Sequence, residues 1–309
     1  MDEKKEEGLF QVRSYLKCLS EGFKLPTRHI LSLLRFLWPS LLVGALSAGL
    51  WGVFFNQLAV VLAGWISATE PVTLLLPAYT LWGLSILSLL ADSFCLGNVM
   101  VAISRYAEAG KWPGMLRFGA CKSDILQASL RALVFLLAGL LVFVLWMTPF
   151  YLWLGAHSVW TLIAGVSCVL LLGVPYSMAG VDYLLGGRQG FVHSLTRMKE
   201  GYQYWGALFI VWFCGGLIMA VFSWVSWLPA AVLSFAGYES LMGTMAGDAT
   251  DLPGMVSVFT VVFFMLASLI TYVSGWLTLF PLSYVYGSVE ARKKDLERFE
   301  AEERELQKL

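Results

Sequence analysis

The sequence predicts an all-α polytopic integral membrane protein, with six transmembrane helices in three hairpins and with cytosolic amphipathic helices. The first observation is composition: 58% of the 309 residues are hydrophobic, 14% are charged, and the mean hydropathy is +0.72. The second is the placement of the 21 Lys and Arg residues, which fall into four blocks. The three apolar stretches between these blocks are each long enough to cross a bilayer twice. Together these observations exclude an ordinary soluble domain.

The basic blocks also predict the topology. They are Lys4–Arg35, Arg105–Arg131, Arg188–Lys199 and Arg292–Lys308. Loops rich in Lys and Arg stay on the cytosolic side, so we expect all four blocks and both termini in the cytosol. The expected location is the cytoplasmic (inner) membrane of a bacterial cell. Because topology already explains the bases, the sequence predicts membrane lipids, and not nucleic acid, as partners.

Six segments are long enough to span the membrane, since about 20 residues at roughly 1.5 Å each cross a core of about 30 Å. We place them near residues 36–66, 72–103, 131–154, 159–183, 204–228 and 255–287. The outer turns are then 67–72, 155–159 and the longer 229–254. Three regions follow: residues 1–35 form a cytosolic amphipathic segment, 36–287 a six-helix transmembrane domain, and 288–309 a charged cytosolic helix.

The N-terminal region carries the pattern of a helix that lies in the plane of the membrane surface. Over Gly8–Phe23, apolar residues recur at steps of three and four, and charged residues fall elsewhere on the helix. The apolar residues are Leu9, Val12, Leu16, Leu19 and Phe23. A helix that docks on protein is the alternative. Pro26 and Pro39 bracket a second short segment, Thr27–Trp38, for which Thr27 is the expected N-cap.

The ends of two spans are similar, which favours a repeated hairpin. Ala102–Lys111 and Ala179–Arg188 each carry a Tyr, a Gly and a base in the same order. The pattern indicates three hairpins, each preceded by a cytosolic amphipathic segment. Chance similarity between short strings of small residues is the alternative.

Two cytosolic segments carry a resemblance to a known group of proteins. The segments read Glu21-Gly-Phe-Lys followed by Leu33–Leu41, and Arg188-Gln-Gly-Phe-Val-His-Ser-Leu-Thr-Arg followed by Lys199-Glu-Gly-Tyr-Gln-Tyr-Trp-Gly. In this layout the chain resembles bacterial YciC-like proteins and the membrane domain found beside some glycerophosphodiester phosphodiesterases. The resemblance implies a multi-pass inner-membrane protein with short basic cytosolic helices. It implies no catalytic residues.

Small residues on the first span predict close helix packing. Ser40, Gly44, Ala48 and Gly52 recur at intervals of four, which places them on one helix face. Such a face lets another backbone approach closely. We expect packing within the chain, with an oligomer interface as the alternative.

Asp92 is the carboxylate placed deepest in the predicted membrane core. It lies about 12 residues from the cytosolic exit, roughly 18 Å deep, and shares a helix face with Ser85 and Ser88. A charge at that depth must be paired, solvated or neutralised. One interpretation is a proton, cation or substrate site. The other is an uncharged acid that links helices by hydrogen bonds, with Ser85, Ser88 or Asn98 as partners.

No enzyme class is indicated by the remaining sequence. The chain has three His and five Cys residues, and it contains no HExxH, GxSxG, GxxxxGK[ST] or CxxC motif. We therefore predict no cofactor, no metal and no catalytic residue. The leading expectation is a non-enzymatic accessory or scaffold protein that engages lipid or other membrane proteins. The alternatives are a small transporter that uses Asp92, and a lipid-modifying enzyme without a recognisable motif.

The topology can be tested with single cysteines placed on the two expected sides. Cysteines at Ser158 and Gly247 should react with an impermeant thiol reagent in intact cells, because these positions lie in outer turns. Cysteines at Glu3 and Gln307 should react only after lysis. Labelling of the terminal positions in intact cells would contradict the topology.

Overall fold

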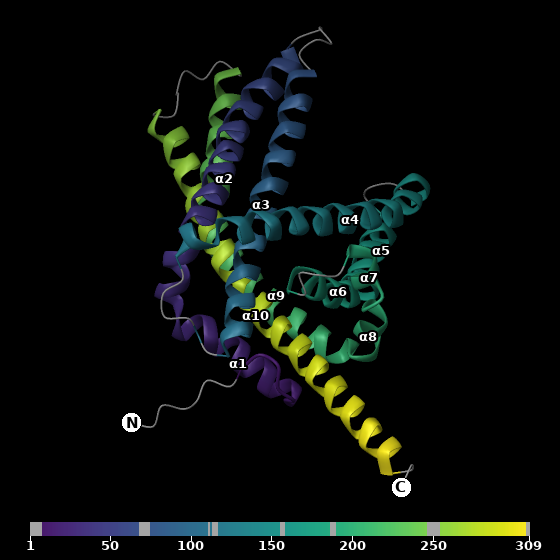
Figure 1. Cartoon of the computed structure of the whole chain (residues 1–309). Helices are drawn as coiled ribbons and strands as arrows, with labels where there is room; N and C mark the ends of the chain where they lie inside the picture. The colour runs from purple at the N-terminus through teal and green to yellow at the C-terminus, as the bar shows by residue number, and fades with distance from the viewer. Residues whose placement is uncertain are drawn as a thin grey trace. The chain divides into compact units, whose positions relative to one another are not determined.

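The computed structural model describes residues 8–67, 75–110, 112, 117–154, 158–185, 190–245 and 254–306, and every regular element in these ranges is helical (Figure 1). Within them, six helical stretches are long and apolar enough to cross a membrane. They are Ile30–Phe55, Tyr79–Ala109, Phe118–Trp153, Val159–Leu185, Trp205–Ser240 and Met255–Leu306. The predicted all-α polytopic fold is confirmed.

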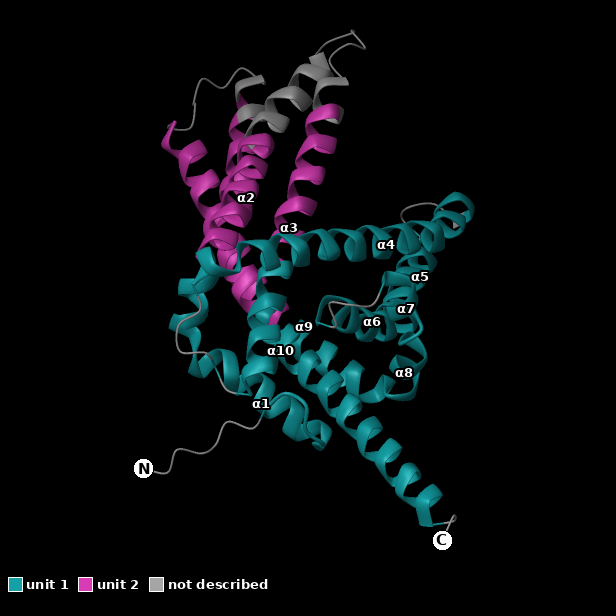
Figure 2. Ribbon diagram, viewed as in Figure 1, with its two compact units in different colours: residues 1–37, 96–216, 276–309 teal, residues 38–95, 217–275 magenta. Residues whose placement is uncertain are grey.

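The chain divides into two compact units (Figure 2). Unit 1 comprises residues 1–37, 96–216 and 276–309, and unit 2 comprises 38–95 and 217–275. Four long helices contribute residues to both units. These helices are α2 (Ile30–Ser67), α3 (Leu75–Ala109), α9 (Trp205–Met245) and α10 (Met255–Leu306).

Unit 2 packs parts of these four helices through small residues and polar side chains. Gly44 and Gly52 on α2 lie directly against α10: a Cβ at Gly44 would overlap the Tyr272 ring, and one at Gly52 would lie 3.0 Å from the Val261 Cα. In the same unit, the Trp227 indole of α9 donates a hydrogen bond to Thr271 Oγ1 of α10 over 3.1 Å. Apolar surface gives little net attraction between helices in lipid, so close packing and such hydrogen bonds hold the unit together.

Unit 1 contains the elements that lie between α3 and α9 in the chain. They are η2 (Phe118–Cys121), α4 (Lys122–Leu154), α5 (Val159–Cys168), the π-helical segment η3 (Val169–Gly173), α6 (Val174–Leu185), α7 (Phe191–Leu195) and α8 (Met198–Gln203). Helix α6 packs against α4, α7 and α8. Between α4 and α6, the Phe135 and Tyr176 rings stack with centroids 4.3 Å apart, and the Tyr176 hydroxyl donates to the Phe135 carbonyl over 2.7 Å.

The π-helical segment η3 leaves one backbone carbonyl without an N–H partner in its own helix, and a side chain from another helix supplies the partner. In a π-helix the carbonyl of Leu170 would accept from the residue five positions later, but that residue is Pro175, which has no N–H. The Trp205 indole donates to this carbonyl instead, over 2.9 Å. The Leu170 carbonyl therefore accepts its hydrogen bond from α9 and not from its own helix. Inside an apolar layer no water is present, so the partner must come from the protein.

The N-terminal helix differs from the prediction for Gly8–Phe23. Helix α1 runs over Tyr15–Arg28, and the Ser14 side chain caps it by accepting from the Lys17 N–H over 3.4 Å. The preceding residues are held on α10: the Arg13 N–H donates to Ser288 Oγ over 3.0 Å, and Leu9 is fully buried. These tertiary contacts outweigh the helical periodicity of residues 8–14.

The prolines interrupt the chain less than the sequence predicted. Thr27 is not an N-cap, because it lies inside α1 and its hydroxyl bonds back to the Phe23 and Lys24 carbonyls. Helix α2 starts at Ile30 and continues through Pro39. Helix α9 likewise continues through Pro229 to Met245, so the expected turn at 229–254 is wrong over most of its length. One lost hydrogen bond per proline is outweighed by the rest of a long apolar helix.

The small-residue face of α2 gives a stability prediction with a matched control. Gly44→Leu and Gly52→Leu should each lower the free energy of unfolding by about 1–3 kcal/mol, because the new side chain meets α10. Gly83→Leu on α3 is the control, since a Cβ there meets no atom within 4 Å. Thermal unfolding in detergent measures all three. Melting of Gly44→Leu and Gly52→Leu at the temperature of Gly83→Leu would contradict the packing.

Candidate functional site

Asp92 has a hydrogen-bond partner that the sequence did not identify. In unit 2, the Tyr272 hydroxyl on α10 donates to Asp92 Oδ1 over 2.6 Å. Asp92 itself is exposed on the protein surface. The carboxyl group is thus joined to a neighbouring helix by one hydrogen bond while part of it faces the surroundings.

The other residues of the predicted polar site lie elsewhere. Ser88 bonds to Ser47 over 3.2 Å and accepts from the Trp51 indole over 2.7 Å, which links α3 to α2. Ser85 is exposed and donates to the Leu81 carbonyl of its own helix. Asn98 is fully buried and belongs to unit 1, whereas Asp92 belongs to unit 2. The sequence predicted that Ser85, Ser88 and Asp92 share one helix face. It did not predict which residues of the neighbouring helices lie opposite that face, so it did not identify Trp51 and Tyr272 as partners.

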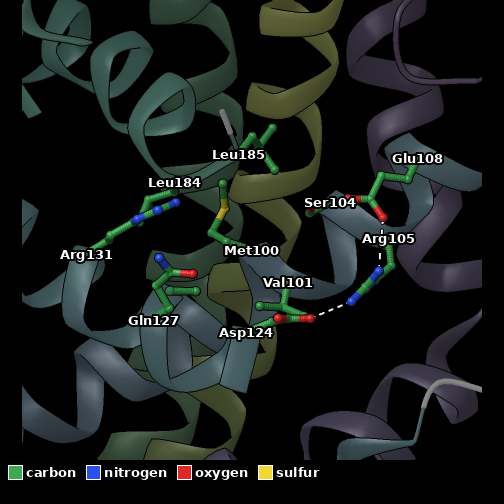
Figure 3. Close-up of a pocket in the computed structure, with 11 residues that line it drawn as sticks. Met100, Val101, Ser104, Arg105, Glu108, Asp124, Gln127, Arg131, Leu184 and Leu185 are labelled. Carbon is green, nitrogen blue, oxygen red and sulfur yellow. Dashed lines mark hydrogen bonds and ion pairs between the residues drawn. The ribbon is translucent and has the colours of Figure 1, made fainter. Parts of the chain in front are cut away.

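A pocket of about 300 Å³ lies in unit 1, where the end of α3, the start of α4 and the end of α6 meet (Figure 3). One part of its lining is polar and one part is apolar. The polar residues are Ser104, Arg105, Glu108, Asp124, Gln127 and Arg131. Sequence analysis placed Arg105 and Arg131 at the two ends of a cytosolic block, but it did not predict a pocket between them.

The α3 side of the pocket carries an ion-paired group. Arg105 forms a salt bridge with Asp124 of α4 and one of 3.1 Å with Glu108 of its own helix, as the dashed lines in Figure 3 show. Glu108 follows Arg105 by three residues, which places both on the same side of the helix. One guanidinium faces two carboxylates here, so this side of the pocket carries one surplus negative charge.

The opposite side of the pocket is basic. Arg131 and Gln127 are four residues apart on α4, so they share a helix face, and Figure 3 shows Arg131 near Leu184 of α6, away from Arg105. A guanidinium offers a planar set of N–H donors that matches a phosphate or carboxylate. The arrangement therefore places a base and acids at different points of one small pocket.

The apolar part of the lining comes from α3, α4 and α6. It consists of Met100, Val101, Ala128, Leu184 and Leu185. A pocket with charged groups on some sides and aliphatic groups on others suits a ligand that is itself amphiphilic.

A second group of charges in unit 1 is partly buried and structural in character. Arg197, just before α8, lies 3.4 Å from Asp182 of α6 and 2.9 Å from both Glu200 of α8 and Glu290 of α10. Asp182 is only 4% exposed, and Tyr286 donates to it over 2.8 Å. Arg197 Nη1 and Glu290 Oε1 form an ion pair without hydrogen-bond alignment. One arginine thus ties three helices together.

Electrostatics keeps this arginine charged. Burial opposes the charge on Arg197, but the hydrogen bond to Glu200 and the charges of Glu290, Glu200 and Asp182 outweigh it, so its pKa is raised above the ordinary value. Lys293 adds a second base, paired with Glu200. A partly buried charge with several partners is costly to disrupt, so the group fixes the α7–α8 segment on α10.

Comparison with known proteins adds no relative. No family model matches the chain, and no curated protein or solved structure matches it. Within the described residues, no group of three or more His, Cys, Asp or Glu side chains is arranged to hold a metal ion. The fold and the candidate spans define the class: an all-α, multi-pass membrane protein.

The Asp92–Tyr272 bond gives a prediction that separates shape from charge. Asp92→Asn keeps an oxygen that accepts from Tyr272, so thermal unfolding in detergent should match the parent. Asp92→Leu and Tyr272→Phe should each lower the free energy of unfolding by about 1 kcal/mol. The double variant with Leu and Phe should lose little more than either single variant, because both remove the same bond. Additive losses in the double variant would show that the bond does not link the two helices.

Proposed function

We propose that this chain is a non-enzymatic multi-pass membrane protein that acts as an accessory or scaffold protein and engages lipid through the pocket between α3, α4 and α6. The observation that carries the proposal is the lining of that pocket. Charged and aliphatic side chains share about 300 Å³ at the ends of three candidate spans. The ends of spans lie at the level of lipid headgroups.

Pocket size and composition favour a headgroup over a whole lipid. A volume of about 300 Å³ is at the lower end of small-molecule sites and too small for two acyl chains. The charged residues can hold the polar group, and Met100, Leu184 and Leu185 can contact the first carbons beyond it. The chains would then remain in the bilayer.

Helix α1 supports a second contact with the membrane surface. Its buried residues, which include Cys18 and Gly22, pack on protein, and Gly22 lies so close to Pro281 of α10 that a Cβ would overlap it. A different face stays open: Leu16 is 75% exposed, next to the exposed base Lys17. One face of α1, with Cys18 and Gly22, therefore docks on protein. The membrane-surface contact is proposed for a different face, which carries Leu16. An exposed leucine beside a base suits an anionic bilayer surface.

The proposal includes a location. Both termini and the pocket would lie on the cytosolic side, in a bacterial cytoplasmic membrane, because the basic blocks at Arg105–Arg131 and Arg292–Lys308 belong to that side. The layout shared with YciC-like proteins supports the same placement.

A small transporter is the second candidate function, and Asp92 is the observation that favours it. The carboxyl group lies within a candidate span and bonds to Tyr272, and an ionisable residue inside a span is a candidate proton or cation site. A folded Asp92→Asn variant that loses its cellular phenotype would favour this function over the accessory role. Retention of the phenotype would favour the accessory role.

The lipid proposal predicts a charge-specific loss of bound phospholipid. Arg131→Gln should lower affinity for co-purifying phospholipid by roughly tenfold, because one charge-assisted contact is lost. Lys122→Gln is the control: it removes the same charge from an exposed position of the same helix, outside the pocket. Phospholipid retained after purification in mild detergent is quantified by mass spectrometry. Equal retention by Arg131→Gln and Lys122→Gln would overturn the proposed function.

A further inference from the structure

The Asp92 carboxylate in unit 2 has capacity for more contacts than the structure gives it. Asp92 is an exposed residue of α3, near the middle of the candidate span Tyr79–Ala109. Tyr272 donates one hydrogen bond to Oδ1, whereas the two oxygens of a carboxylate can together accept about four. The Tyr272 hydroxyl is uncharged, so it does not neutralise a carboxylate. A charge at this depth requires a further partner, a proton or water.

Unit 2 has no base that could supply this partner. The sequence of its two stretches, residues 38–95 and 217–275, contains no Lys, Arg or His. The rest of the chain carries its Lys and Arg in the four basic blocks, which we assign to the cytosolic side. Lipid headgroups are also remote, because Asp92 lies roughly 20 Å along the helix from the Tyr79 end of the span. A charge that complements Asp92 within the apolar layer therefore points to another protein.

The surface around Asp92 has the composition of a contact between transmembrane helices. Leu81 and Ser85 share the Asp92 face of α3, at intervals of four and seven residues, and all three are exposed. Beside them, Trp82 is 70% and Ile86 57% exposed. These five residues form the α3 strip, in which apolar side chains surround one hydroxyl and one carboxylate. Carboxylates in spans face a partner or water and not lipid, so this composition favours a covered surface.

We propose that the α3 strip docks a transmembrane helix of another membrane protein, and that this partner helix presents a lysine or arginine to Oδ2 of Asp92. The pair cancels two charges that are each costly alone within the layer. The inference goes beyond the lipid contact proposed above and does not depend on it, because the pocket lies in unit 1 and Asp92 in unit 2. It gives the accessory role a partner of defined chemistry.

The test uses the full-length protein in phosphatidylcholine vesicles and three synthetic transmembrane peptides of about 23 residues. The peptides are identical Leu/Ala helices except for a central Lys, Gln or Leu. Fluorescence energy transfer between labelled protein and labelled peptide measures association. The Lys peptide should bind roughly tenfold more tightly than the Leu peptide, as expected for one strong polar contact in a bilayer. Equal binding of these two peptides would overturn the inference, and so would binding of the Gln peptide as tightly as the Lys peptide.

Three variants locate the contact. Asp92→Asn should lose most of the preference for the Lys peptide, because it removes the charge and keeps only a neutral acceptor. Tyr272→Phe should keep the preference, because the carboxylate remains. Glu239→Gln is the matched control, since it removes an acid from another exposed position of unit 2, and it should also keep the preference. Thermal unfolding in detergent shows that each variant is folded. An unchanged preference in folded Asp92→Asn would contradict the proposed contact.

Other occupants of the α3 strip give different results. If a water-filled cavity reached the strip, a cysteine at Ser85 would react with an impermeant thiol reagent in intact cells; this result would overturn the inference and favour the transporter function. Self-association of the parent protein in vesicles that is lost in Asp92→Asn would assign the strip to a second copy and would also overturn it. Neither result bears on the lipid pocket, which the comparison of Arg131→Gln with Lys122→Gln tests separately.

Discussion

The structure depends on one constraint: within an apolar layer, every backbone polar group must find its partner inside the protein. Helices satisfy it along most of the described chain, and the exceptions show how strictly it applies. Pro175 removes a donor from α6, the helix shifts to π geometry at η3, and the Trp205 indole takes the place of the missing N–H at the Leu170 carbonyl. Some hydroxyls of the spans also find partners within the protein: Ser85 bonds to its own helix and Tyr272 to Asp92 of a neighbouring one.

Charged side chains in unit 1 form two groups with different arrangements. Around Arg197, carboxylates from α6, α8 and α10 converge on one partly buried guanidinium, so the charges neutralise one another and fix the elements in place. In the pocket between α3, α4 and α6, Arg105 lies beside Asp124 and Glu108 while Arg131 lies at another part of the lining, so the charges are spread around the pocket. The first arrangement suits structure and the second suits binding.

Local sequence patterns predicted the long elements well and the breaks between them poorly. Long apolar stretches are strong signals because a helix satisfies all backbone hydrogen bonds within the segment, which lipid requires. All six predicted spans were found. Proline was overrated as a breaker: α2 passes through Pro39 and α9 through Pro229, because each loses one hydrogen bond within a helix that keeps the others. Periodicity was overrated at residues 8–14, where Leu9 and Arg13 contact α10 and the helix starts only after Ser14.

The sequence by itself determined that this protein is an all-α chain with six candidate spans, since hydropathy and segment length depend only on neighbouring residues. It also identified Asp92 and the glycines of α2 as residues that must contact something. Only the tertiary structure decided what they contact, because Tyr272 follows Asp92 by 180 residues. The pocket has the same origin. Arg105, Asp124, Arg131 and Leu184 come from three helices, and no local pattern encodes the register at which those helices pack.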